Sequence, residues 1–108
     1  MVPTFDGQIH PAAKKEFMVL QATGARRSIG PLLTLIDEVI DHGLASGEAP
    51  VVPVPVPNGS GLYERCAPKL FGVFAIYAPA PGNPLPVLRL LAVNASATAA
   101  RADAVGRV

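Results

Sequence analysis

The chain of 108 residues has no tryptophan and a single cysteine, Cys66, and only 6% of its residues are aromatic. One thiol cannot form an internal disulfide, and without a nearby histidine it is a poor metal ligand or nucleophile. We therefore interpret Cys66 as a small apolar side chain in a strand. Zinc-type ligand spacing, a glycine-rich phosphate loop and internal repeats are also missing. The sequence predicts no metal and no cofactor.

Charge is scarce as well. Charged residues make up 16% of the chain and the formal net charge is +1. A protein that binds nucleic acid through its overall field usually carries a marked excess of basic residues. We therefore expect no DNA binding by the protein itself, and any contact with RNA has to be local.

Long apolar runs are absent too. The richest one, LFGVFAIYAPAP, is too short and too broken to span a bilayer, and the first residues lack a basic start followed by an apolar stretch. These features predict a cytoplasmic protein with no membrane partner.

Half of the residues are hydrophobic, which is enough to bury one core but not two. We expect one domain over residues 1–108. His10-Pro11 favours a helix start after a short extended segment, and Ala13, Phe17 and Leu20 recur at helical spacing up to Gln21. A second helix is expected to open at Ser28 or Gly30-Pro31, with a broad apolar stripe formed by Leu32, Leu33, Leu35, Ile36, Val39, Ile40 and Leu44.

The sequence pattern of the second half of the chain predicts mainly strands. VVPVPVP, residues 51–57, alternates valine with proline, which lacks an N–H group, so it predicts an edge strand or an extended strap. A polyproline ligand for a partner is the alternative. Residues 62–66, 71–78 and 87–93 are strand-like and predict an antiparallel meander. A short helix follows, capped by Asn94 or Ser96. The predicted fold class is α+β: a short opening strand, a two-helix hairpin on an antiparallel sheet of three to four strands, and a short C-terminal helix.

Several phrases, taken with this order of elements, resemble the RelE/ParE superfamily of bacterial toxins from toxin–antitoxin pairs. HPAAKKEFMVL resembles the family's entry into its first helix, and GLYER resembles the opening of its sheet hairpin. FGVFAIY and VLRLLAV are similar to the next two strands, and ADAVGRV to the closing helix. The resemblance covers most of the chain. A generic small α+β domain with the same pattern is the alternative.

The resemblance implies that the protein inhibits growth by acting on an essential target. RelE-like members cut messenger RNA in the ribosome by attack of a 2′-hydroxyl on the adjacent phosphate, and ParE-like members bind the host protein gyrase. A cognate antitoxin is implied as a partner in either case. RNA cleavage needs a group that takes up the hydroxyl proton and cations that stabilise the phosphorane charge.

The sequence supplies that set only in part. In the matching phrases the two positions where phosphate-handling arginines are expected hold Cys66 and Ala75. Arg65 stands one residue early, and one step along a strand turns a side chain to the opposite face unless a bulge intervenes. The remaining candidates for catalysis are Glu64 as a base, together with Arg65, Tyr77 and Arg89. Each also has an ordinary interpretation as a surface or sheet residue.

A small basic patch is the candidate surface for RNA or a partner, formed by Lys14, Lys15, Arg26, Arg27 and Lys69. The same residues are typical of a solvated surface, and the acidic residues Asp37, Glu38 and Asp41 are available to pair with them. Because the expected arginines are missing, binding of the ribosome, mRNA or a host protein is the favoured function. A RelE-like endonuclease with a reduced site and a plain interaction domain that uses the valine–proline strap are the alternatives.

Overall fold

The protein is described by a computed structural model that covers residues 4–22, 26–43, 52–55, 61–67 and 70–108, with the backbone alone for residues 26–28 and 52–54. The elements follow in the order β1 (Asp6–Ile9), α1 (Pro11–Ala22), α2 (Arg26–His42), β2 (Val52–Val54), β3 (Leu62–Ala67), β4 (Leu70–Tyr77), β5 (Val87–Asn94) and α3 (Ala97–Val105). The predicted α+β class and layout are confirmed.

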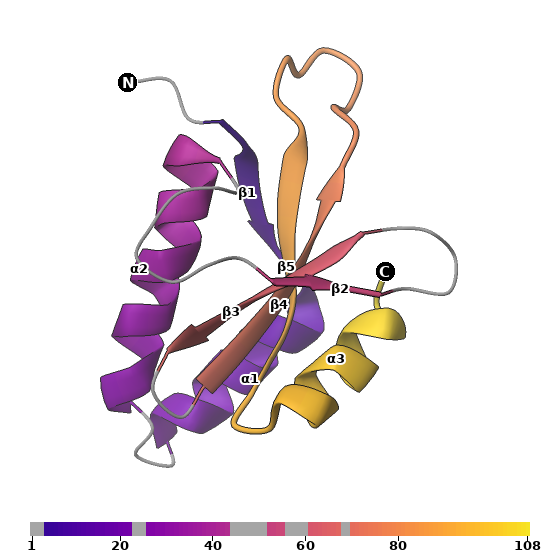
Figure 1. The fold of residues 1–108 in the computed structure, drawn as a ribbon. Coiled ribbons are helices and arrows are strands. Elements are labelled where there is room, and N and C mark those ends of the chain that lie inside the picture. The colour runs from indigo at the N-terminus through magenta and orange to yellow at the C-terminus, as the bar shows by residue number, and fades with distance from the viewer. Residues whose placement is uncertain (1–3, 23–25, 44–51, 56–60, 68–69) are drawn as a thin grey trace.

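The strands form one sheet of five in the order β1-β5-β4-β3-β2 (Figure 1). β3, β4 and β5 make the expected antiparallel meander, and β2 lies at the edge, antiparallel to β3, as the missing N–H of Pro53 requires. β1 pairs with β5 in parallel, so the sheet is mixed. The opening strand therefore extends the sheet at the edge opposite β2.

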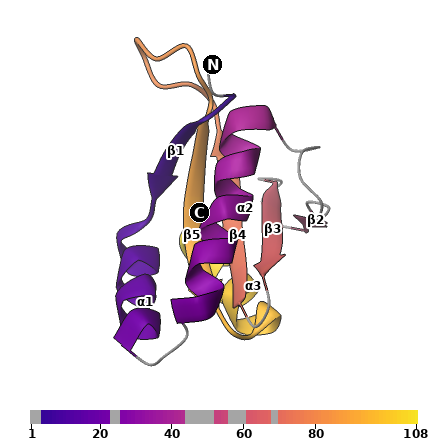
Figure 2. The same cartoon turned by 90° about the vertical axis from the view of Figure 1, so that its left-hand side faces the viewer.

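Helices α1 and α2 cover one face of the sheet (Figure 2). The amphipathic spacing of α1 buries Ala13 and Phe17. Of the stripe expected on α2, Leu32, Ile36 and Val39 are buried and Leu35 and Ile40 are half-buried, whereas Leu33 is exposed and Leu44 lies outside the described residues. The buried side chains pack against alternate residues of the strands. The core on this face includes Phe5, Ala13, Phe17, Ile29, Leu32, Ile36, Val39, Leu70, Phe74, Leu88, Leu90 and Val93.

Helix α3 covers the opposite face of the sheet. Its small-residue side buries Ala100 and Ala104 against Val73, Leu91 and Ala92, so the sheet lies between two helical layers. The Oγ of Ser96 accepts a hydrogen bond from the Ala99 N–H at 3.3 Å, which makes Ser96, of the two expected candidates, the N-cap of α3. Small alanine side chains let α3 sit close to the strands.

Helix α2 begins earlier than expected, at Arg26, and Pro31 lies inside it. A proline disfavours helical backbone in the residue before it through a clash with that residue's Cβ, and Gly30 has no Cβ. The helix therefore continues through Pro31. The start of α1 follows the expectation, because His10 Nδ1 accepts a hydrogen bond from the Ala12 N–H at 3.1 Å. Among the described residues, no helix is long and apolar enough to cross a membrane.

Candidate functional site

The alternation of β3 divides the predicted catalytic residues between the two faces of the sheet. Glu64 is bound by Arg101 of α3, whereas its neighbour Arg65 is bound by Glu38 of α2. Tyr77 packs in the cluster beneath α3, and Arg89 lies opposite Ala75 of that same cluster. Glu64, Tyr77 and Arg89 therefore share the α3 face, and Arg65 lies on the α1/α2 face.

Arg65 would reach the α3 face only through a bulge in β3, and none is present. β3 pairs with β4 in one unbroken register from Leu62 to Ala67. The Arg65 side chain is 0% exposed, and its Nη2 lies 3.5 Å from Glu38 Oε2. A buried cation held under a helix cannot contact a substrate on the far side of the sheet. The structure thus separates Arg65 from the other three candidates.

Glu64 is buried and held in a two-pronged ion pair. Arg101 Nε donates to Glu64 Oε2 at 2.9 Å, and Arg101 Nη2 donates to Glu64 Oε1. Hydrogen bonding by the Glu64 carboxylate, with its negative charge, raises the pKa of Arg101. Both carboxylate oxygens already accept a bond from a guanidinium. In this arrangement the Glu64 carboxylate is a hydrogen-bond acceptor that ties β3 to α3.

Tyr77 and Arg89 are the two candidates that lie near each other on the α3 face. Within the described residues, neither takes part in an ion pair. Both are half-buried, and the register places Arg89 opposite Ala75 and Tyr77 opposite Val87, so the two are diagonal neighbours on one face. Arg89 Nε is buried, and no described atom accepts a hydrogen bond from it. A cation and a phenol are therefore adjacent here.

Ala75 and Cys66, at the two positions where arginines were expected, also differ in setting. Ala75 is 1% exposed and lies between Leu62 and Arg89 in the sheet register. In this row of the sheet the arginine is Arg89 of β5, one strand away from the expected position at Ala75 of β4. Cys66 is exposed, and its thiol donates a hydrogen bond to the neighbouring Ala67 carbonyl at 3.4 Å.

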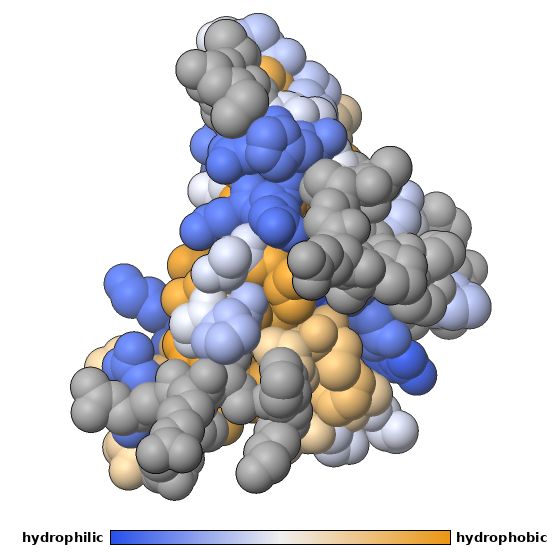
Figure 3. All heavy atoms as spheres, turned by 60° about the vertical axis from the view of Figure 1, so that its left-hand side comes forward, coloured by the Kyte–Doolittle hydropathy of each residue, from blue (hydrophilic) through white to orange (hydrophobic). Residues whose placement is uncertain are grey.

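The predicted basic patch is described in part. Lys14 and Lys15 are exposed on α1. Arg26 and Arg27 form the first turn of α2, but their side chains and all of Lys69 lie outside the described residues. Asp37, Asp41 and His42 of α2 are exposed, and Figure 3 shows a hydrophilic area at this end of the helix above an apolar one. Glu38 pairs with Arg65.

A polar cluster that the sequence did not reveal lies at the edge of β5. Glu16 Oε1 accepts a hydrogen bond from the Val93 N–H at 3.3 Å, and Arg107 Nη1 lies 2.6 Å from the same carboxylate oxygen. Arg107 Nη1 also donates to the Leu91 carbonyl at 2.9 Å. Glu16 and Arg107 are 91 positions apart in the chain, so no local pattern could have paired them.

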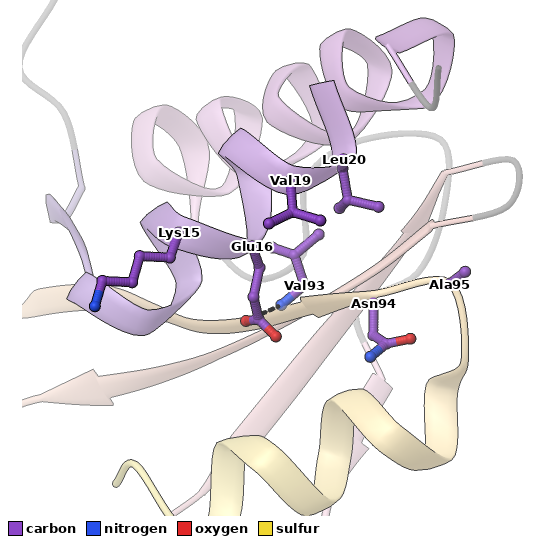
Figure 4. A pocket seen from close by; sticks show the side chains of 7 residues that line it. All are labelled: Lys15, Glu16, Val19, Leu20, Val93, Asn94 and Ala95. Carbon is purple, nitrogen blue, oxygen red and sulfur yellow. Dashed lines mark hydrogen bonds between the residues drawn. The ribbon is translucent and has the colours of Figure 1, made fainter. Parts of the chain in front are cut away.

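A groove of about 340 Å³ opens beside this cluster. It is lined by Lys15, Glu16, Val19, Leu20, Val93, Asn94 and Ala95. Figure 4 shows Val19 and Leu20 of α1 above the end of β5, while Lys15 extends away along the helix. The groove has an apolar wall and one carboxylate that is already in use, which suits contact with an apolar side chain better than chemistry.

Within the described part of the chain, no group of three His, Cys, Asp or Glu side chains could hold a metal ion. Comparisons of the chain with protein-family models, with curated proteins and with solved structures found no match.

Proposed function

We propose that this protein is a toxin-like member of the RelE/ParE type that inhibits growth in the cytoplasm by binding an essential target, and that it does not cut RNA. The target is the ribosome with its mRNA or a host protein such as gyrase, and a cognate antitoxin holds the protein inactive. The proposal rests on the resemblance of the sequence phrases together with the state of the residues that would perform the cleavage.

The observation that carries the proposal is the ion pair between Glu64 and Arg101. RNA cleavage by 2′-hydroxyl attack needs a base with a free acceptor. The only carboxylate among the predicted catalytic residues has both oxygens bonded to Arg101, and Arg65 is buried on the other face of the sheet. Of the predicted catalytic residues on the α3 face, Arg89 and Tyr77 remain, a cation and a phenol. Such a pair can recognise an anionic or carbonyl-rich surface through hydrogen bonds.

A second candidate function is the reduced RelE-like endonuclease. One observation favours it: Arg89 Nε is buried without an acceptor in the described residues, next to Tyr77 in the register. A phosphate oxygen would satisfy that donor, and a tyrosine hydroxyl can move a proton. In this version Tyr77 is the general acid or base and Arg89 stabilises the phosphorane.

Regulated expression in a bacterial host tests the proposed function. Growth arrest on induction of the wild type is expected, and Arg89→Ala should relieve it because the cation on the α3 face is lost. Arg89→Lys is the matched control that keeps the charge, and Arg89→Ala must be shown to accumulate in folded form. Unimpeded growth with abundant folded wild-type protein would overturn the toxin proposal.

A further inference from the structure

The edge of β5 is only half covered. β1 pairs with β5 from Val87 to Leu90, and the chain then turns into α1 at Pro11 (Figure 2). Beyond Leu90, the outward-facing Leu91 carbonyl and Val93 N–H are bound by the side chains of Arg107 and Glu16. An open strand edge is a template for pairing with another chain, and here two side chains occupy the positions that a neighbouring backbone would take.

Exposed apolar side chains gather in the segments that border this edge. Six large hydrophobic residues of the described chain are exposed, and four of them belong here. Val19 of α1, which lines the groove, is 62% exposed, and its neighbour Met18 on the same helix is 64% exposed. Val105 and Val108 flank Arg107, which reaches the edge from the opposite helical layer. Exposed apolar residues thus belong to the helical segments that supply Glu16 and Arg107 to this edge.

The bonding groups of this edge are complementary to themselves. In an antiparallel ladder, pairs of facing residues alternate between pairs that hydrogen-bond to each other and pairs that do not. Next to a non-bonded pair of residues i and j, the N–H of residue i+1 donates to the C=O of residue j−1, and the N–H of j+1 donates to the C=O of i−1. If Ala92 faces Ala92 of a second copy across a two-fold axis, the Val93 N–H of each copy meets the Leu91 carbonyl of the other. These are the two groups that the structure shows pointing outward.

We propose that this edge is a homodimer interface, in which β5 of two copies pairs antiparallel about an axis at Ala92 and joins their sheets. Glu16 and Arg107 exchange partners, so that Glu16 of each copy pairs with Arg107 of the other. A self-complementary patch of this kind is the requirement for a two-fold interface. The exposed residues of α1 in the two copies then pack together, as do the C-terminal segments. This inference is independent of the proposed function, since it uses neither Tyr77 nor Arg89.

Sedimentation equilibrium and light scattering of the full chain test the proposal, over concentrations from about 1 µM to about 1 mM. The wild type is expected to approach twice the 11.2 kDa of the chain. Val19→Asp should weaken the dimer by about tenfold or more, because it sets two like charges against each other at the axis. Leu33→Asp is the matched control: Leu33 is 40% exposed on α2 and lines a second pocket that shares no residue with this groove, and the change should leave the dimer intact.

Complementary charge reversal identifies the exchanged ion pairs. Glu16→Arg and Arg107→Glu should each abolish self-association, whereas an equimolar mixture should form a mixed dimer, because each arginine at 16 then meets a glutamate at 107. Far-UV circular dichroism confirms that each variant is folded. A wild type that stays at 11.2 kDa up to about 1 mM, a dimer indifferent to Val19→Asp, or a mixture that remains monomeric would each overturn the proposal.

Discussion

Glu64 and Arg65 are adjacent in the sequence and serve opposite layers of the molecule. The first ties α3 to the sheet through Arg101, and the second ties α2 to it through Glu38. Because strand side chains alternate, one dipeptide supplies a polar anchor to each face. Side chains that hold two layers in place are poorly suited to move protons during a reaction, and this is the residue-level reason for favouring binding.

Truncation of the Arg65 side chain should lower the stability of the fold strongly, whereas replacement by a residue of similar length should lower it much less. Arg65→Ala leaves a cavity under α2 and is expected to lower the free energy of unfolding by about 3 kcal/mol. Arg65→Met fills much of that volume, and the half-exposed Glu38 regains water, so less than half of that loss is expected. Urea titration measures both. Equal losses for the two variants would show that the charge of Arg65, and not its bulk, stabilises the fold.

Removal of Arg101 should loosen α3. In Arg101→Ala the buried Glu64 carboxylate loses both guanidinium donors, so the midpoint of urea unfolding is expected to fall, with Arg101→Lys in between. The Glu64 carboxylate raises the pKa of Arg101. On that account the contribution of Arg101 is fully present at neutral pH and is lost only as the pH rises through the raised value. The midpoint difference between wild type and Arg101→Ala should therefore be equal at about pH 7 and about pH 10.

At the scale of the elements, α2 and β4 meet closely at Gly72. A Cβ there would lie 3.3 Å from Leu32 Cδ1 and from Ile36 Cδ1. Gly72→Val is expected to overpack this contact and to lower the free energy of unfolding by about 1–3 kcal/mol. Gly106 at the end of α3 is the control: its φ is −73° and an added Cβ makes only an ordinary contact. Gly106→Ala should stabilise by about 0.4–1 kcal/mol, and the same urea titration compares them.

Most elements could be predicted from local patterns, because periodicity, proline and caps act over a few residues. The amphipathic stripe of α2, the meander from β3 to β5 and the Ser96 cap are such cases, and alternation along β3 already implied that Glu64 and Arg65 diverge. The parallel pairing of β1 with β5 and the placement of α3 on the far face depend on contacts across the whole chain. The arginine partners of Glu64 and Glu16 lie 37 and 91 positions away in the chain, so local patterns could not predict these ion pairs either.

At the scale of the whole molecule, a five-stranded sheet lies between two helical layers. The exposed strand edges on its two sides are protected in different ways. The β2 edge is blunted by proline, and the β5 edge is capped by the Glu16–Arg107 pair. The α3 face carries Tyr77 and Arg89, and the carboxylate of Glu64 on this face is bound to Arg101. We propose that the protein associates with its target through one sheet face and with a second copy along one strand edge.

Mapping of RNA 5′ ends in ribosome-bound mRNA, after induced expression of wild type and of Tyr77→Phe, tests the central claim most directly. We predict growth arrest by the wild type with no new ends inside open reading frames, and an unchanged RNA pattern in the variant. New ends that appear with the wild type and vanish with Tyr77→Phe would contradict it, since they would make Tyr77 a catalytic residue of an endonuclease.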